Sequence, residues 1–240
     1  MLFAEWRLVL TGPADGYVNM AIDEATLTLV AEHRVPPTVR IYSWESPCIS
    51  VGYLQRLAPM RSDILGHKDL RCVRRLTGGK ACLHGGDLSY SVVVSQSDTL
   101  LPSDVVESYE RISSGIIEGL RLLGIDSRFA PPVQVHLDNH SIATAAQARR
   151  QGVLLHQGTI ALTPCTLAGG EALPRQKLSA VSEIVGGVVD LEAGAHALGM
   201  GLMSALGVDL SPGVLFAREK RLARQLWREK YMTPEWTFAR

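Results

Sequence analysis

The sequence predicts an α/β protein built on a mixed sheet with helices packed against it. Segments of alternating or continuous apolar residues, typical of strands, dominate the first two-thirds of the 240 residues. Helical patterns are interspersed among them, and the part after Pro164 reads as a loop followed by helices. Apolar residues make up 46% of the chain, so a sizeable core is expected and disorder is not.

The first helix is expected over residues 20–34, with Asn19 as its N-cap and Asp23 and Glu24 near its positive end. Residues 88–95 alternate between apolar residues and serines, which predicts a half-buried strand with one polar side. Other strand patterns in this half of the chain cover residues 5–10, 38–44, 47–53, 72–75 and 81–84.

A second helix is predicted to begin after Asp104, which can act as its N-cap, and to end at Gly124. Its apolar residues recur at steps of three and four. The remaining segments are expected as extended chain over 131–137 and 141–148, a strand or strand pair over 152–162, a loop over 165–178, and helices over 190–207 and 217–231.

Composition excludes several classes of function. The formal net charge is zero, which argues against a broad electrostatic grip on nucleic acid. No apolar stretch approaches about 18 residues and no signal peptide is evident, so a cytoplasmic protein without a membrane span is expected. The four cysteines form no CxxC pair, and no metal cluster is visible. No Ser, His and Asp trio has a spacing typical of a hydrolase.

The most informative stretch is RRLTGGKACLHGGDLSYSVVV, residues 74–94. A Gly-Gly pair between two strands can serve merely as a hairpin turn. It can also let a ligand lie against the main chain, because glycine lacks a Cβ atom. Arg74 and Arg75 alternate across a strand, so one of them would face such a ligand, and a guanidinium suits a carboxylate or phosphate. His84 would hold the loop or contact the ligand.

This stretch resembles the signature of the lipoate–protein ligase A family, including its octanoyltransferase branch, within the biotin/lipoate ligase superfamily. The segments NMAIDEATL, PPTVRIYSWESPCISVGYLQ, AQARRQGVLLHQGTIAL and KYMTPEWTF resemble further family segments in family order. The resemblance implies a class II synthetase-like catalytic domain with a largely antiparallel sheet. It implies one domain over residues 1–240, helical from about 176 to 240, without a separate accessory domain.

The resemblance also implies an activity on lipoyl or octanoyl groups. Such proteins transfer or ligate this acyl group to a lysine of a lipoyl carrier domain, of the 2-oxoacid dehydrogenase E2 or glycine cleavage H type. Ligases activate free lipoate or octanoate with ATP and Mg²⁺, whereas transferases take the acyl group from an acylated carrier, usually through a cysteine thioester. The residues that would line the acyl or nucleotide site are Ser43, Trp44, Gly52, Tyr53, Arg74, Arg75, Thr77, Gly78, Gly79, His84, Gln147 and Gly158.

The chain departs from the family pattern at the catalytic positions. Ser141 stands where the family has a lysine that contacts the reacting carbonyl, and Thr144 and Ala145 replace the following glycine and serine. Removing a donor beside a developing oxyanion typically costs roughly a hundredfold in rate. The transferase cysteine has no counterpart in residues 129–140.

Three interpretations remain open. Another cation can take the place of the family lysine, either Lys80 in the glycine motif or Arg149 and Arg150 after the AQ segment. The protein can instead be a non-catalytic paralogue that binds the acyl group or the carrier, or its fold can accept an unrelated ligand. Cys82 is a further candidate nucleophile, because Lys80 and His84 lie two residues away on the same strand face.

Overall fold

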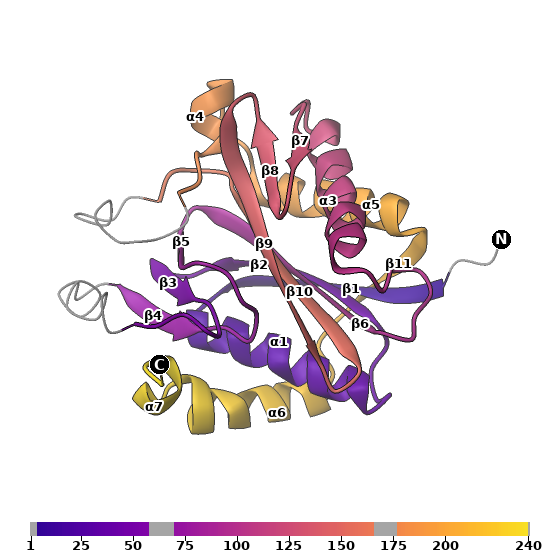
Figure 1. Cartoon of the computed structure of the whole chain (residues 1–240), viewed down its shortest axis with the longest axis vertical. Helices are drawn as coiled ribbons and strands as arrows, with labels where there is room; N and C mark the ends of the chain where they lie inside the picture. The colour runs from indigo at the N-terminus through magenta and orange to yellow at the C-terminus, as the bar shows by residue number, and fades with distance from the viewer. Residues whose placement is uncertain (1–3, 58–69, 166–176, 240) are drawn as a thin grey trace.

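The computed structural model describes residues 4–57, 70–165 and 177–239. It arranges them as two sheets with helices on both sides of the larger one (Figure 1). Most of the loop predicted over residues 165–178 lies outside the described residues. No helix in the described ranges combines the length and the apolar character that a membrane span needs.

The larger sheet is mixed and largely antiparallel, as the sequence predicts. Its first strand, β1, pairs in parallel with the strands on both of its sides, and the remaining pairs are antiparallel. In spatial order the strands are β11 (Val208–Gly213), β1 (Ala4–Ala14), β2 (Thr38–Trp44), β6 (Asp87–Ser95), β10 (Val153–Ala161), β9 (His140–Arg150), β8 (Gln134–Leu137) and β7 (Arg128–Ala130).

Strand β11 differs from the expectation that residues 176–240 are helical. Its partner is β1, with Ala4 opposite Val208 and Val9 opposite Gly213. The segment Val208–Gly213 contains a proline and a glycine, so its local propensity for a strand is weak. Pairing with β1, rather than its own pattern, makes it extended.

The smaller sheet has β3 (Cys48–Val51) in its centre, with β4 (Arg71–Arg74) parallel on one side and β5 (Cys82–His84) antiparallel on the other. Strands β4 and β5 are therefore not paired with each other. The interpretation of Gly78–Gly79 as a simple hairpin turn is wrong, because the glycine loop crosses over β3 instead of joining two neighbouring strands.

Helices cover both faces of the larger sheet. Helices α3 (Val105–Leu122) and α5 (Leu191–Leu206) pack against each other on one face, and α1 (Gly16–Ala31) lies on the other with α6 (Ala217–Leu226) outside it (Figure 1). Helix α6 continues as a π-helical segment, Trp227–Tyr231. Two short helices, α4 (Val181–Val185) and α7 (Pro234–Thr237), also lie in the described part of the chain.

The N-caps of two helices show where neighbouring residues were enough to predict the start of a helix and where they were not. Asp104 caps α3 by accepting from the amide of Glu107 at 3.0 Å, as predicted. Helix α1, however, begins at Gly16 and is capped by Asp15, whose Oδ1 accepts from the amide of Tyr17 at 2.8 Å. The prediction of Asn19 as the N-cap is wrong, because Asn19 lies inside the helix and is buried.

The serine face of β6 is also buried, so the prediction of a half-buried strand is wrong. Ser91 donates to Oδ1 of Asp23 at 2.9 Å, and Ser89 donates to Oδ2 of Asp87 at 2.9 Å. These hydroxyls satisfy buried carboxylates instead of facing water. Helix α1 covers this face of the sheet, which a period-two pattern cannot reveal.

Candidate functional site

A cavity of about 440 Å³ lies where the small sheet and the glycine loop meet β9 and β10. This volume falls within the range of about 300–1,000 Å³ that is usual for small-molecule sites. Its wall combines apolar and polar side chains. The lining residues are Met20, Tyr42, Trp44, Ser50, Arg75, Gly79, Lys80, Cys82, His84, Ser89, Pro132, Val133, Gln134, Thr144, Ala145, Ala146, Gln157, Gly158 and Thr159.

The glycine loop forms one side of this cavity and requires a close approach of two backbones. Gly79 has a φ of +86°, a conformation that favours glycine. A Cβ atom built on Gly52 would lie 2.0 Å from the carbonyl oxygen of Gly79, so only a glycine fits at position 52. Thr77 donates to Oε1 of Gln157 at 2.7 Å and ties the loop to β10. Gly79 lines the cavity, whereas Gly52, Thr77 and Gly78, which the sequence also predicts in the site, are not part of its wall.

The two arginines of the motif hold backbone carbonyls. Arg75 donates to the carbonyl oxygens of Ser50 at 2.9 Å and of Lys80 at 2.8 Å, and burial lowers its pKa to about 10. Arg74 donates to the carbonyl oxygens of Gly52 at 2.7 Å and of Thr237 at 3.1 Å. Arg75 lies on the cavity wall and Arg74 does not. The sequence predicts that one of these arginines binds an anionic ligand. In the structure, the N–H donors of Arg75 are instead used largely by backbone carbonyls around the glycine loop.

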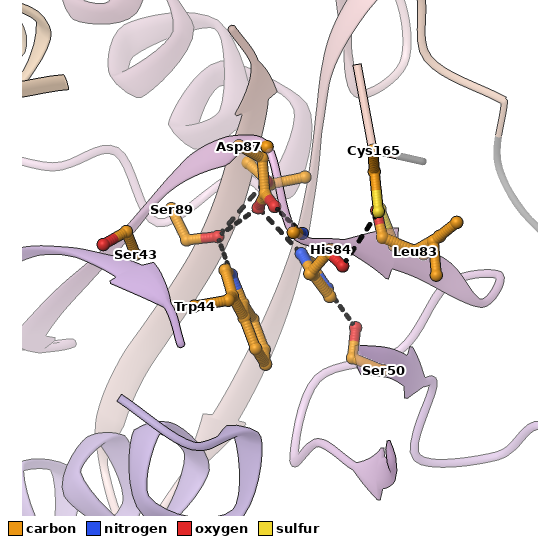
Figure 2. Close-up of polar contacts among 12 residues, drawn as sticks. Ser43, Trp44, Ser50, Leu83, His84, Asp87, Ser89 and Cys165 are labelled. Atoms are coloured by element: carbon orange, nitrogen blue, oxygen red, sulfur yellow. Dashed lines mark hydrogen bonds and ion pairs between the residues drawn. The ribbon is translucent and has the colours of Figure 1, made fainter. Parts of the chain in front are cut away.

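His84 connects two residues that lie far apart in the sequence. Its Nε2 lies 2.8 Å from Oγ of Ser50 on β3, and its Nδ1 lies 2.8 Å from Oδ2 of Asp87 on β6 (Figure 2). The indole of Trp44 stacks on the imidazole with a centroid separation of 3.9 Å and an interplanar angle of 13°. The Nε1 group of Trp44 donates to Ser89 at 2.9 Å, which fixes the indole in turn.

Asp87 is buried yet well satisfied. It accepts hydrogen bonds from the amide of Gly85 at 2.9 Å and from the hydroxyls of Ser89 and Thr159. Burial alone would raise its pKa, but the charge and hydrogen bond of His84, with the bonds from Thr159 and Gly85, lower it below the usual value. Asp87 is therefore an ionised acceptor at neutral pH.

The altered catalytic positions and the alternative candidates differ in whether they reach the cavity. Ser141 is outside the cavity wall, and its buried Oγ makes no hydrogen bond to any residue that the structure describes. Thr144 and Ala145 line the cavity. Lys80 is exposed at the cavity and is the only lysine in its described wall. Cys82 lines the wall beside Lys80 and is buried.

Neither of the arginines after the AQ segment lines the cavity. Arg149 donates to Oε1 of Gln147 at 2.9 Å and to Oγ of Ser108 at 3.2 Å, on the side of the sheet that α3 covers. Arg150 lies over the ring of Tyr53, with 4.2 Å between its Cζ and the ring centroid. The structure therefore brings Lys80, and not these two arginines, to the cavity.

Gln147 also faces α3, so the expectation that it lines the site is wrong. Its Nε2 lies 3.0 Å from Nδ1 of His156, a buried imidazole whose pKa falls to about 3 through desolvation and the nearby charge of Arg149. Tyr53 and Ser43 lie outside the lining as well. Tyr53 packs on Trp236, with 6.0 Å between ring centroids.

Gly158 and Trp44 line the cavity. A Cβ atom on Gly158 would lie 2.3 Å from the phenol of Tyr90, its cross-strand partner. The glycine therefore makes room for a core tyrosine on the α3 side, while its backbone forms part of the cavity wall.

Sequence reasoning missed the Ser50–His84–Asp87 arrangement and the role of Gln157. The sequence alone predicts no catalytic role for Ser50 or Asp87. Pairing of β3 with β5 brings Ser50 and His84 together although 34 positions separate them in the sequence. The only local signal was Asp87 three residues after His84. Among the described residues, no group of three or more His, Cys, Asp or Glu side chains is placed to hold a metal ion.

Residues 15–188 match the family model of the lipoyl protein ligase A/B catalytic domain. The chain belongs to this family. It is also 36% identical to the octanoyltransferase LipM of Kyrpidia tusciae, over 97% of this chain and 98% of the relative. The predicted family is confirmed, and the matched range includes the glycine loop, His84 and the strands around the cavity.

Solved structures agree with this assignment. A T. acidophilum protein assigned to the lipoate protein ligases, solved with bound lipoic acid, superposes with a TM-score of 0.81 at 27% identity, covering 98% of this chain and 99% of the other. A bi-partite lipoate protein ligase studied with its E2 lipoyl domain, from Thermoplasma acidophilum, gives 0.80 at 25% identity, covering 98% and 96%. The predicted fold of this family is thereby confirmed.

Proposed function

We propose that this protein is an octanoyltransferase of the lipoyl protein ligase A/B family. It moves a medium-chain acyl group from an acylated carrier protein to a lysine of a lipoyl domain. Similarity to LipM over nearly the whole of both chains supports a transferase in preference to a ligase. We also infer that residues 1–240 form one catalytic domain, because β11 pairs with β1 within the larger sheet.

The observation that carries this proposal is the mixed apolar and polar lining of the cavity. Met20, Pro132, Val133 and Ala146 supply apolar surface for an acyl chain. Ser50, Lys80 and His84 add polar groups to the same wall. A fatty acyl group needs both environments, since its tail is apolar and its reacting carbonyl is polar.

Lys80 is the residue best placed to replace the family lysine. Lys80 belongs to the cavity wall and is also exposed, which fits a position where the cavity meets solvent. A cation there can stabilise the oxyanion that forms when the carbonyl is attacked. Exposure at the same point lets the lysine of a carrier domain approach the acyl group.

Acyl exchange between purified proteins tests the function. The protein is incubated with an octanoylated acyl carrier protein and an unmodified lipoyl domain of the E2 or H type, and intact mass spectrometry follows both carriers. We expect the octanoyl group to appear on the lipoyl domain without ATP. A parallel reaction with free octanoate or lipoate, ATP and Mg²⁺ tests ligation.

The outcomes separate the three activities. Product that depends on ATP and arises only from free acid would show a ligase and overturn the transferase proposal. No product in either reaction, together with octanoate binding in calorimetry, would identify a non-catalytic acyl-binding protein.

A further inference from the structure

We propose that Ser50 carries the acyl group as an ester during transfer, with His84 as its general base and Asp87 as the residue that orients His84. This inference rests on the proposed acyl transfer and supplies the nucleophile that the chain lacks at the usual cysteine position. It departs from a cysteine mechanism, because the acyl group would be held on oxygen instead of sulfur.

The hydrogen bonds around Ser50 have only one consistent direction when His84 is neutral. Nη1 of Arg75 lies 3.1 Å from Oγ of Ser50, and a guanidinium can only donate, so Oγ accepts there. The ionised carboxylate of Asp87 can only accept, so Nδ1 of His84 carries a hydrogen. Nε2 of the neutral imidazole is then an acceptor, and the hydroxyl hydrogen of Ser50 points to it across 2.8 Å.

This direction is the one that a nucleophilic serine requires. A base within hydrogen-bond reach removes the hydroxyl proton, and a third group orients the base. The donor from Arg75 adds a positive charge beside the oxygen that becomes negative. The same arrangement on unrelated folds is recognised by its geometry and roles and not by the order of its residues in the chain.

The array is also held rigidly. Ser50 and His84 lie on paired strands, and Asp87 begins β6 in the larger sheet. Trp44 lies against His84, and Ser89 bonds to Asp87 (Figure 2). Gly85 and Thr159 also donate hydrogen bonds to Asp87. Supporting contacts of this kind keep catalytic groups within the narrow tolerance that catalysis needs.

The position of the array in the cavity fits an acyl ester. Ser50 and His84 both line the cavity whose wall also carries the apolar surface for the chain. Ser50 is nevertheless only 2% exposed, so bulk water has little access to it. An ester formed there would be shielded from hydrolysis until the acceptor amine arrives.

The reaction balances without any further reactant. Oγ of Ser50 attacks the carbonyl carbon of an acyl thioester, the O–H proton moves to Nε2 of His84, and the C–S bond breaks as the leaving thiol takes that proton. The lysine amine of the lipoyl domain then attacks the ester. A C–N bond forms, the C–Oγ bond breaks, and a proton from the amine returns through His84 to Ser50.

Trapping the intermediate tests this inference. Wild-type protein is mixed with octanoylated acyl carrier protein without an acceptor, and intact mass followed by peptide mapping locates the adduct. We expect an octanoyl ester on Ser50 that resists neutral hydroxylamine, unlike a thioester. Ser50→Ala should lose the adduct and lower the transfer rate at least about 100-fold. Ser114→Ala, on α3, is the matched control and should behave as the wild type.

The positioning role of Asp87 has its own readout. Asp87→Asn should retain octanoate binding while the rate of ester formation falls and its pH profile changes, because the amide no longer holds the proton on Nδ1 of His84. An adduct on Cys82, or wild-type transfer by Ser50→Ala, would overturn the inference and leave the acyltransferase function intact.

A probe that needs no carrier separates this inference from the proposed function. An octyl fluorophosphonate phosphonylates activated serines directly. Labelling of Ser50 in the wild type, absent in Ser50→Ala, would support the array even if neither transfer reaction yields product. Absence of labelling in folded wild-type protein, shown folded by circular dichroism, would contradict it.

Discussion

Arg75 donates a hydrogen bond of 2.8 Å to the carbonyl oxygen of Lys80, so a buried guanidinium holds the loop that carries the candidate catalytic ammonium. The same guanidinium also bonds to the carbonyl of Ser50 at 2.9 Å. Arg75 thereby links the glycine loop to the strand that carries the proposed nucleophile. The motif arginine acts on the ligand site through the backbone that surrounds it.

Arg75→Lys keeps the positive charge, but we expect it to lower both the stability of the protein and its affinity for octanoate. A lysine ammonium lacks the planar fork of donors and cannot reach the same carbonyls together. Buried carbonyls left without partners cost about 1–3 kcal/mol, so the free energy of unfolding should fall by that amount in urea titrations. Octanoate affinity measured by calorimetry should fall too.

Arg71→Lys is the matched control. The Arg71 side chain is 55% exposed and pairs with Asp15 at 2.9 Å. Its replacement should change the free energy of unfolding by less than about 0.5 kcal/mol. Wild-type stability and octanoate affinity in Arg75→Lys would show that the loop does not depend on this guanidinium.

Gly52→Ala should displace the glycine loop. The new methyl group would lie 2.0 Å from the carbonyl oxygen of Gly79, so one backbone must move. Overpacking of this kind typically costs about 1–3 kcal/mol. We expect a lower melting temperature and weaker octanoate binding. Gly12→Ala is the control, because no atom lies within 4 Å of its added Cβ. Equal effects of the two substitutions would argue against the close approach at Gly52.

Lys80→Met tests the substitute cation. If its ammonium stabilises the oxyanion, transfer to the lipoyl domain should fall by about 100-fold while the protein stays folded. Lys80 is exposed, so circular dichroism and the melting temperature should be unchanged. Lys220→Met, on the surface of α6, should transfer at the wild-type rate. A wild-type rate in Lys80→Met would remove Lys80 from the mechanism.

His156 should make the protein less stable in mild acid. Burial lowers its pKa from 6.5 to about 3, so below about pH 6.5 the unfolded chain binds a proton that the folded state does not. The contribution of the neutral imidazole to the free energy of unfolding is fully present above that pH. It declines as the pH falls toward 3, by up to about 1.4 kcal/mol per pH unit. In His156→Gln this part of the slope should disappear. Urea unfolding at pH 7.5 and 4.5 measures the difference, and identical slopes in both proteins would contradict the buried neutral imidazole.

Two helices show how much the local sequence decides. Asp104 and Gly124 mark the ends of α3, and Asp190 and Gly207 mark those of α5. In each case a side chain or a positive φ satisfies the helix ends through residues only a few positions away. The predicted strands β2 and β10 likewise follow from segments rich in apolar and β-branched residues.

The sequence by itself determined the family, the helix boundaries of α3 and α5, and the glycine loop that borders a cavity. The tertiary structure alone decided that the serines of β6 are buried, that residues 208–213 form a strand, and that Ser50 meets His84 and Asp87. The physical reason is the sequence separation over which each interaction acts. Caps and turns depend on residues a few positions away in the chain. Burial, sheet pairing and the Ser50–His84 contact depend on strands that pair across large sequence separations. A spacing rule cannot detect a trio whose members are joined only when β3 pairs with β5.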